Sequence, residues 1–545
     1  MYKSTKSICI FVNFRNFVDT RMYDILIRNS TIIDGAKNNK YKADIGITEG
    51  KIKLIGRLGA IKAEVVIGAD DLYAAPGFID LNNHSDTYLT LFTIPSLESL
   101  LKQGITTILG GVCGSSLAPL VSAETLKTIQ KWADIREINL NWLIFKEFLD
   151  EVSKMKLSLN FASLVGHSTI RRGILKDDWR KIKPKEMRMM KELLKSSLKE
   201  GAFGLSTGLA YSHAKIATIK EIIELAKIVK DFEGLYATHI RGEAEELIPA
   251  IEETIEVAKK TKVSTEISHL KAMGRKFWPN MAKAINLIEG AKNVRINFDV
   301  YPYTITGSVL YILLPDWVAE GGRAMFLKRL RNPKIKAKVI QEMQERKDYE
   351  YDKITVVMSP MDKTFIGRRI TEIAKSQNVS VEEAVVNMLI ASEGRVITFL
   401  DTLNPDNVEA GLSHALSFIA SDGAGYNLQY YFNKRELVHP RCFGAFTRFL
   451  GKYVREKQIL SWEEAIYKIT GGPAEKLGLK DRGLIKEGYW ADLVLFNPKK
   501  IIDKATFENP YQYSGGIDYV FVNGKTAIEK GVYTGERAGR VLKKS

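Results

Sequence analysis

The sequence predicts an α/β protein built on a (β/α)₈ barrel of the TIM type, with a small β-sandwich and an inserted lid subdomain. Three observations support this prediction. Eight strand-length apolar runs occur between residues 76 and 480, and most are followed by an amphipathic helical pattern. Short alternating runs lie at both ends of the chain, and a long segment interrupts the series after its seventh run. Apolar strands that alternate with helices are typical of a parallel sheet buried on both faces.

The two ends of the chain have the pattern of antiparallel hairpins. Residues 22–75 contain DILIRNSTIIDG and ADIGITEGKIKLIG, and residues 481–545 contain WADLVLFNP. We expect both segments to pair into one sandwich. Residues 1–21 do not fit this pattern, because polar residues interrupt their apolar stretch and no small-residue cleavage site follows. We therefore expect a frayed leader, or a start codon upstream of the real start at Met22, rather than a secretory signal.

Each predicted barrel strand ends in polar residues. In chain order the strands are YAAPGFIDLNNH, GITTILGGVCG, LNFASLVGH, GAFGLSTG, GLYATHIRG, VSTEISHLK, VRINFDVYPY and LSFIASDG. Catalytic groups of such a barrel lie where the strands end. The segment between the last two strands, about residues 310–409, contains two helical stretches and the strand-like KITVVMS. An insertion of this size predicts a lid or a substrate-recognition subdomain.

Composition and charge exclude several classes of protein. The 545 residues are 45% hydrophobic and 26% charged, with a formal net charge of +16 spread along the chain. No Arg-rich stripe alternates with aromatic residues, so we expect no specific nucleic-acid partner, and the positive charge suits a small anionic substrate. No run approaches the ~18 apolar residues of a membrane-spanning helix. The 3 cysteines are too few for a disulfide framework and predict a cytoplasmic protein.

Four residues at strand ends predict a metal-dependent hydrolase. They are Cys113, His239, His269 and Asp422. His239 and His269 are one β/α unit apart, so the barrel places them on neighbouring strands that face the same mouth. A thiolate, two imidazoles and a carboxylate suit zinc, and a metal-activated water is a nucleophile. His167 also ends a strand, and we expect it to support the site rather than to bind the metal.

Several stretches from Met22 onward carry a family resemblance. They are PGFIDLNNHSD, QGITTILGGVCGSSLAPL, LVGHSTIR, GAFGLSTGLAY, YATHIRGEAEEL, ISHLKAMG, DVYPYT, SDG, HPRCFGAF and LGLKDRGLIKEGYWADLVLFNP. With these stretches the sequence resembles the N-acyl-D-amino-acid deacylases (D-aminoacylases) of the amidohydrolase superfamily. The resemblance implies zinc-dependent hydrolysis of the amide bond of N-acyl-D-amino acids, which releases a carboxylate and a D-amino acid.

The resemblance also implies roles for individual residues. Cys113, His239 and His269 match the ligands of a tightly held zinc ion. Asp422 matches the carboxylate that takes a proton from the attacking water and later passes it to the departing amine. Arg441 matches a residue that binds the α-carboxylate of the substrate, for which a planar bidentate donor is suited.

Three further residues match substrate contacts in the family. Lys271 and Tyr211 match contacts to the carboxylate or the carbonyl of the substrate, and Tyr303 is a candidate for lining the pocket. From its position alone, Tyr211 is explained equally well by ordinary packing. The substrate is then a small molecule that carries a carboxylate.

The sequence departs from the family at three places. The first histidine of the family's His-x-His pair is replaced in Asn82-Asn83-His84, and asparagine is a poor zinc ligand beside imidazole. We therefore expect one zinc ion per chain, with His84 as a further candidate ligand or as a hydrogen-bond partner of substrate or water. The segments SHAK and YNLQYYFNKREL differ where a pocket wall is expected, which leaves the side-chain specificity open.

Two alternatives and the oligomeric state stay open at this point. The same site could hydrolyse a cyclic amide, as in dihydroorotases and hydantoinases, or a D-configured dipeptide. A protein of another class, an inactive amidohydrolase-like scaffold, is suggested by Asn82. The retained thiol, imidazoles and carboxylate argue against the scaffold, which has no use for that set.

Overall fold

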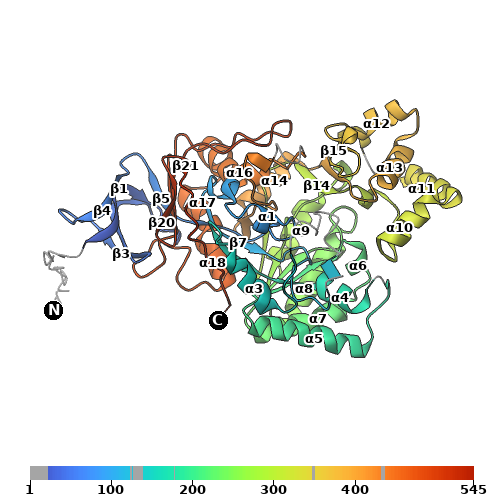
Figure 1. Ribbon diagram of the computed structural model, residues 1–545, viewed down its shortest axis with the longest axis horizontal. Coiled ribbons are helices and arrows are strands. Elements are labelled where there is room, and N and C mark those ends of the chain that lie inside the picture. Colours follow the sequence, from blue (N-terminus) through green and yellow to red (C-terminus); the bar gives the residue numbers. More distant parts are fainter. Residues whose placement is uncertain are drawn as a thin grey trace, which may run out of the picture.

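The computed structural model describes residues 22–122, 125–126, 139–176, 178–346, 350–430 and 436–544. The predicted leader, residues 1–21, lies outside the described residues. Figure 1 shows three parts in a row, with a β-rich end, a central barrel and a mixed helical and stranded part at the opposite end. In the part of the chain that the structure describes, no helix is both long enough and apolar enough to cross a membrane.

The central part is a parallel barrel whose strands match the eight predicted ones. The strands are β6 (Phe78–Asp80), β7 (Ile105–Gly110), β8 (Asn160–Ser163) continued by β9 (Val165–Gly166), β10 (Gly204–Gly208), β11 (Leu235–His239), β12 (Ser264–Ile267), β13 (Ile296–Val300) and β17 (Ser417–Ile419). Paired neighbours run parallel. A parallel bridge between Asn83 and Gly423 connects the first strand to the last. This closure brings residues from opposite ends of the barrel sequence to one rim.

Apolar side chains fill the barrel and cover its outside. Ile79, Leu109 and Ala237 belong to one buried cluster of barrel-strand residues. Helix α7 (Ile219–Asp231) illustrates the outer layer, since its N-cap Thr218 accepts a hydrogen bond from the backbone N–H of Glu221 and its apolar residues recur at helical spacing. The other helices outside the insertion are α1 (Thr90–Thr93), α2 (Glu98–Leu101), α3 (Phe145–Lys154), α4 (His167–Leu175), α5 (Pro184–Lys199), α6 (Ser212–Lys215), α8 (Leu247–Thr261), α9 (Asn280–Glu289), α14 (Pro405–Ser413), α16 (Arg441–Arg448), α17 (Trp462–Ile469), α18 (Gly471–Leu477) and a π-helix (Phe449–Glu456).

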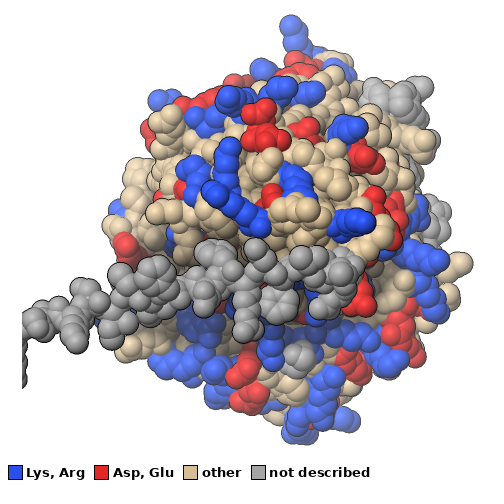
Figure 2. All heavy atoms as spheres, turned by 90° about the vertical axis from the view of Figure 1, so that its left-hand side faces the viewer, with Lys and Arg blue, Asp and Glu red and all other residues tan. Residues whose placement is uncertain are grey.

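Both ends of the described chain form the β-rich part, as predicted. Its strands are β1 (Tyr23–Ile32), β2 (Tyr41–Thr48), β3 (Lys51–Gly56), β4 (Ala63–Gly68), β5 (Tyr73–Pro76), β18 (Leu493–Phe496), β19 (Ile517–Val522), β20 (Lys525–Glu529) and β21 (Val532–Tyr533). Strand β5 pairs antiparallel with β18, which joins the two ends in one sheet system. Ile27, Ile45 and Leu493 lie in the core of this part. On the face in Figure 2, basic and acidic side chains of the described residues are interspersed.

The inserted part has its own sheet and its own core. Strands β14 (Ile305–Val309), β16 (Ile397–Asp401) and β15 (Ile354–Met358) form an antiparallel sheet in that order. Its helices are α10 (Gly322–Arg331), α11 (Pro333–Arg346), α12 (Ile370–Gln377) and α13 (Val381–Ala391). These elements enclose a separate hydrophobic core. Because α14 contacts β13 and β17 of the barrel, we propose Ile305 and Asp401 as the bounds of the insertion.

Candidate active site

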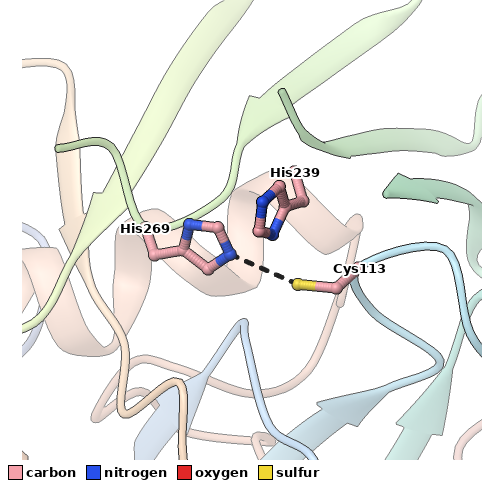
Figure 3. Close-up of side chains that lie close together, drawn as sticks. All are labelled: Cys113, His239 and His269. Carbon is pink, nitrogen blue, oxygen red and sulfur yellow. Dashed lines mark hydrogen bonds between the residues drawn. The ribbon is translucent and has the colours of Figure 1, made fainter. Parts of the chain in front are cut away.

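Cys113, His239 and His269 meet at one buried point on the barrel rim (Figure 3). Cys113 and His269 follow strands β7 and β12, and His239 is the last residue of β11. The Sγ atom of Cys113 lies 3.4 Å from Nε2 of His269. The two imidazole rings lie 4.4 Å apart between centroids, at an interplanar angle of 82°. One ligand atom from each of the three residues lies within 4.8 Å of the other two, which is the spacing of a compact metal site.

The backbone at the strand ends is held in an uncommon conformation. Cys113, His269 and Asp422 have φ values of 50°, 39° and 47°, in the left-handed region that non-glycine residues rarely adopt. Such backbone conformations cluster at functional sites, where the surrounding structure maintains them. The turn that contains Cys113 is also closely packed. A Cβ atom on the neighbouring Gly114 would lie 2.5 Å from the backbone nitrogen of Gly208. The glycine-rich turn predicted around Cys113 therefore has a steric cause.

The electrostatics of the three residues fit a cation at this point. Burial lowers the pKa of His239 to about 3, so this imidazole is neutral at pH 7, as a metal ligand must be. Burial, together with the charges of Asp422 and Asp299, raises the pKa of the Cys113 thiol well above its usual range. A bound divalent cation reverses this effect, because a coordinating thiol loses its proton. Sulfur and imidazole nitrogen are the donor atoms that zinc prefers.

Asp422 lies beside this cluster, and its carboxylate contacts the side chains of His84 and Arg441. Its Oδ1 atom lies 3.0 Å from Nε2 of His84, and its Oδ2 atom lies 2.6 Å from Nη1 of Arg441. Burial opposes ionisation, but Arg441, His269 and His84 hold the pKa of Asp422 well below its usual range. The side chain is therefore a carboxylate at neutral pH, ready to accept a proton. His84, Cys113 and Asp422 also place ligand atoms within 4.8 Å of one another.

Asn82 is buried and its amide is directed toward an acidic side chain. Its Nδ2 atom donates to Oδ1 of Asp299 at 3.4 Å. The same Asp299 oxygen accepts a hydrogen bond from the backbone N–H of His269 at 2.8 Å. Asn82 thus takes part in the support of the rim through Asp299.

Glu243 is a site residue that the sequence interpretation missed. Its Oε1 atom lies 3.1 Å from Nδ1 of His269 and 2.5 Å from Nζ of Lys271. The same atom is 3.9 Å from Nε2 of His239. Lys271, His239 and His269 hold the pKa of Glu243 well below its usual range against the effect of burial. The signal available in the sequence was its place four residues after His239, in the stretch HIRGE.

Of the remaining predicted residues, Tyr211 lines the cavity described below, whereas Tyr303 does not. The ring of Tyr211 lies 4.9 Å from that of His239, and both line the cavity described below. Tyr303 is not among the lining residues; its ring packs edge-on against His439 at 5.2 Å. His167 is buried, and its Nε2 atom lies 2.9 Å from Oε1 of Glu221.

A cavity of about 710 Å³ opens between the barrel rim and the insertion. The barrel contributes His84, His239, His269, Asp422 and Arg441 to its wall. Strands β14, β15 and β16 of the insertion contribute the facing wall. This volume is in the usual range for small-molecule sites, so the cavity can enclose a small substrate beside Cys113, His239 and His269.

Curated relatives match over nearly the whole chain. The chain is 32% identical over 528 residues to the D-aminoacylase of Alcaligenes xylosoxydans xylosoxydans. This match covers 96% of this chain and 98% of the relative. It is 31% identical over 522 residues to the N-acyl-D-aspartate deacylase of the same organism, with 95% of each covered. A family model described as "Amidohydrolase family" matches residues 438–528.

Solved structures match over the same length. The N-acyl-D-glutamate deacylase of Bordetella bronchiseptica, crystallised with zinc and a phosphonate mimic of the tetrahedral intermediate, superposes with a TM-score of 0.81 at 28% identity. A D-aminoacylase superposes with a TM-score of 0.81 at 30% identity. That enzyme has a binuclear metal centre, in which one metal activates and the second attenuates. Both matches cover 96% of this chain and 100% of the other chain.

Proposed function

Because the chain belongs to the N-acyl-D-amino-acid deacylase (D-aminoacylase) family of metal-dependent amidohydrolases, we propose that it hydrolyses N-acyl-D-amino acids at the site of Cys113, His239 and His269. The reaction releases a carboxylate and a D-amino acid. The observation that carries the proposal is the convergence of these three ligands beside an ionised Asp422. The bond cleaved is an amide C–N bond outside a peptide chain.

We assign one zinc ion per chain to the three ligands. The set of one sulfur and two nitrogen atoms leaves a coordination position for substrate or water, as catalytic zinc sites do. Asn82 supports a single ion, because it supplies no imidazole beside His84 and its Nδ2 atom donates to Asp299. When bound, zinc supplies a Lewis acid that polarises the substrate carbonyl and lowers the pKa of the attacking water.

Asp422 carries the proton transfers in this mechanism. Its low pKa keeps it ionised at the start of the reaction, when it takes a proton from the attacking water. The same carboxyl group then donates that proton to the nitrogen of the breaking C–N bond, so the amine leaves as a neutral group. His84, 3.0 Å from Oδ1, keeps the carboxylate oriented during both transfers.

Arg441 and Lys271 bind the carboxylate end of the substrate. The guanidinium of Arg441 lies over the ring of Tyr301, 4.8 Å from its centroid, and its Nε atom has no acceptor among the described residues. This Nε–H can therefore donate to a substrate carboxylate beside the Nη1 atom that pairs with Asp422. Lys271 lies two residues after His269 and is buried at the same rim. We keep Tyr211 as a further substrate contact, since its ring flanks His239 in the cavity.

The proposal is tested with zinc-loaded protein and paired N-acetyl-D- and N-acetyl-L-amino acids. We expect the D-substrates to be hydrolysed with a kcat/KM at least about 100-fold higher than that of the L-substrates, because inverting the α-carbon moves the side chain or the amide out of place while the carboxylate stays on Arg441. Release of free amino acid measures the rate. Rapid cleavage of a cyclic imide without release from either N-acetyl series would contradict the proposal and favour a cyclic amidase.

Glu243 is a positioning residue in this mechanism. A metal-bound histidine usually donates its second ring N–H to a carboxylate, which fixes the tautomer and the ring orientation. With Oε1 3.1 Å from Nδ1, Glu243 can accept that proton from His269 and leave Nε2 for the metal. It also neutralises Lys271, which otherwise places a positive charge next to the cation site.

Replacing Glu243 by glutamine is expected to weaken zinc binding by about 10- to 100-fold, the usual effect of removing such a partner. Competition with a chromogenic chelator measures the zinc affinity without relying on activity. Glu245→Gln is the matched control, because Glu245 lines the same cavity but is exposed. Equal zinc affinity in the Glu243→Gln variant and the parent protein would show that Glu243 does not position a ligand.

A further inference from the structure

One wall of the cavity is apolar and comes from the insertion. We define the insertion wall as five residues that line the cavity and belong to one hydrophobic cluster: Val357, Met358, Ile397, Phe399 and Leu437. Strands β15 and β16 hold the first four of them. The backbone N–H of Leu437 donates to the carbonyl of Val357 at 3.1 Å, so the segment before Arg441 is attached to this sheet.

The insertion wall lies beside the guanidinium that binds the substrate carboxylate. A Cβ atom built on Gly307 would lie 3.7 Å from Cδ1 of Phe399 and 4.0 Å from Nη2 of Arg441, so the ring and the guanidinium flank the same point. His439 connects them further, since its ring is 5.1 Å from that of Phe399 and its Nδ1 atom accepts the backbone N–H of Arg441. The carboxylate and the side chain of an amino acid share one carbon atom, so a substrate held by Arg441 presents its side chain close to Phe399.

The described residues that line the cavity leave no buried cation for a second carboxylate. Among the described lining residues, every buried or half-buried lysine and arginine has a carboxylate partner. Two of them, Arg441 and Lys271, are the cations that we assign to the α-carboxylate, and they also pair with Asp422 at 2.6 Å and Glu243 at 2.5 Å. The other two, Lys215 and Arg241, pair with Asp316 at 2.5 Å and Glu253 at 2.7 Å. The other described lining cations, Arg275, Lys276 and Arg346, are exposed. An acidic substrate side chain would thus leave water for an apolar surface without a compensating charge, which is costly.

We propose that the insertion wall is the side-chain pocket, and that the preferred substrates are N-acyl-D-amino acids with apolar side chains such as D-leucine and D-phenylalanine. This inference rests on the proposed deacylase function and narrows its substrate class. Similarity alone does not make this choice, because the curated relatives include a D-aminoacylase as well as a D-aspartate and a D-glutamate deacylase at nearly equal identity. The composition of the wall does, since burial of apolar side-chain surface there is favourable.

A substrate panel tests the inference with zinc-loaded parent protein and the N-acetyl derivatives of D-leucine, D-phenylalanine, D-alanine, D-aspartate and D-glutamate. We expect the kcat/KM for D-leucine and D-phenylalanine to exceed that for the two acidic substrates by about 100-fold. In the Phe399→Ala variant we expect about a 10- to 100-fold loss for D-phenylalanine and D-leucine, and a much smaller change for D-alanine, whose methyl group does not reach the ring.

A gain-of-function variant keeps the inference falsifiable if Phe399→Ala does not fold. Met358 is half-buried at the end of β15, and Met358→Arg places a cation in the wall. We expect this variant to raise the kcat/KM ratio of D-glutamate to D-leucine by about 10-fold or more. Met361→Arg is the matched control, because Met361 is 56% exposed and does not line the cavity.

The outcomes separate the inference from the function on which it rests. Acidic substrates that are hydrolysed as fast as D-leucine, or an unchanged ratio in Met358→Arg, would overturn the apolar pocket and leave the deacylase function intact. If zinc-loaded protein hydrolyses none of the five D-substrates, the proposed function fails, and the inference fails with it.

Discussion

Replacing Asp422 by asparagine is expected to lower kcat by about 10³-fold or more while zinc stays bound, on the scale of general acid–base groups that work with a metal. Asparagine keeps the size of the side chain but has no basic oxygen. It can neither take the proton of the attacking water nor return it to the leaving amine. Because Arg441, His269 and His84 hold the pKa of Asp422 well below its usual range in the parent protein, that base is present throughout the neutral pH range.

The measurement combines turnover of an N-acetyl-D-amino acid with elemental analysis of bound zinc. Asp503→Asn is a matched control, because Asp503 also pairs with an arginine, Arg448, at 2.9 Å, but does not line the cavity. We expect turnover close to that of the parent protein in this control. An Asp422→Asn protein that binds zinc and keeps near-normal turnover would exclude the proton-transfer role.

Replacing Cys113 by alanine is expected to remove zinc and, with it, essentially all activity. Cys113 contributes the only sulfur to the three clustered ligands, and two imidazoles alone hold zinc far more weakly than three ligands do. We expect the parent protein to contain about one zinc ion per chain and the variant to contain almost none after dialysis. We expect chelator treatment of the parent protein to give the same inactive state, and added zinc to reverse it.

Cys442→Ala is the control for the loss of a buried thiol. Cys442 is also buried but belongs to neither of the two groups of potential metal ligands in the described residues. The zinc content of the Cys442→Ala variant is expected to equal that of the parent protein. Full zinc content in Cys113→Ala would contradict the assignment of this thiol as a ligand.

Much of the architecture was accessible from local sequence patterns. The alternation of apolar strands with amphipathic helices predicted the barrel strands, because apolar runs of strand length reflect burial on both faces and the 3.6-residue period reflects the buried face of each helix. In the insertion, the predicted strand corresponds to β15 and the two predicted helices correspond to α12 and α13. The register of the barrel also made it possible to expect Cys113, His239, His269 and Asp422 at one rim, where the structure places them.

Other features depend on contacts between distant segments. Glu243 follows no strand directly, and only its distances to His269 and Lys271 identify it. Tyr303 was expected in the pocket from its motif, but the chain turns its ring toward His439 instead. A motif fixes residue types and spacing, whereas the direction of a side chain after a strand end depends on the loop that packs against it.

By itself, the sequence determined the class of fold and the residue types that can hold a metal ion, because these depend on local periodicity and on the chemistry of single side chains. The family followed from the resemblance of its motifs. Only the tertiary structure decided that Glu243 contacts His269, that Asp422 and Arg441 are paired, and that the insertion adds an apolar wall to the cavity. The physical reason is that each of these features is a contact between side chains far apart in the chain, and its energy depends on the distance and burial that the closed barrel and the folded insertion impose.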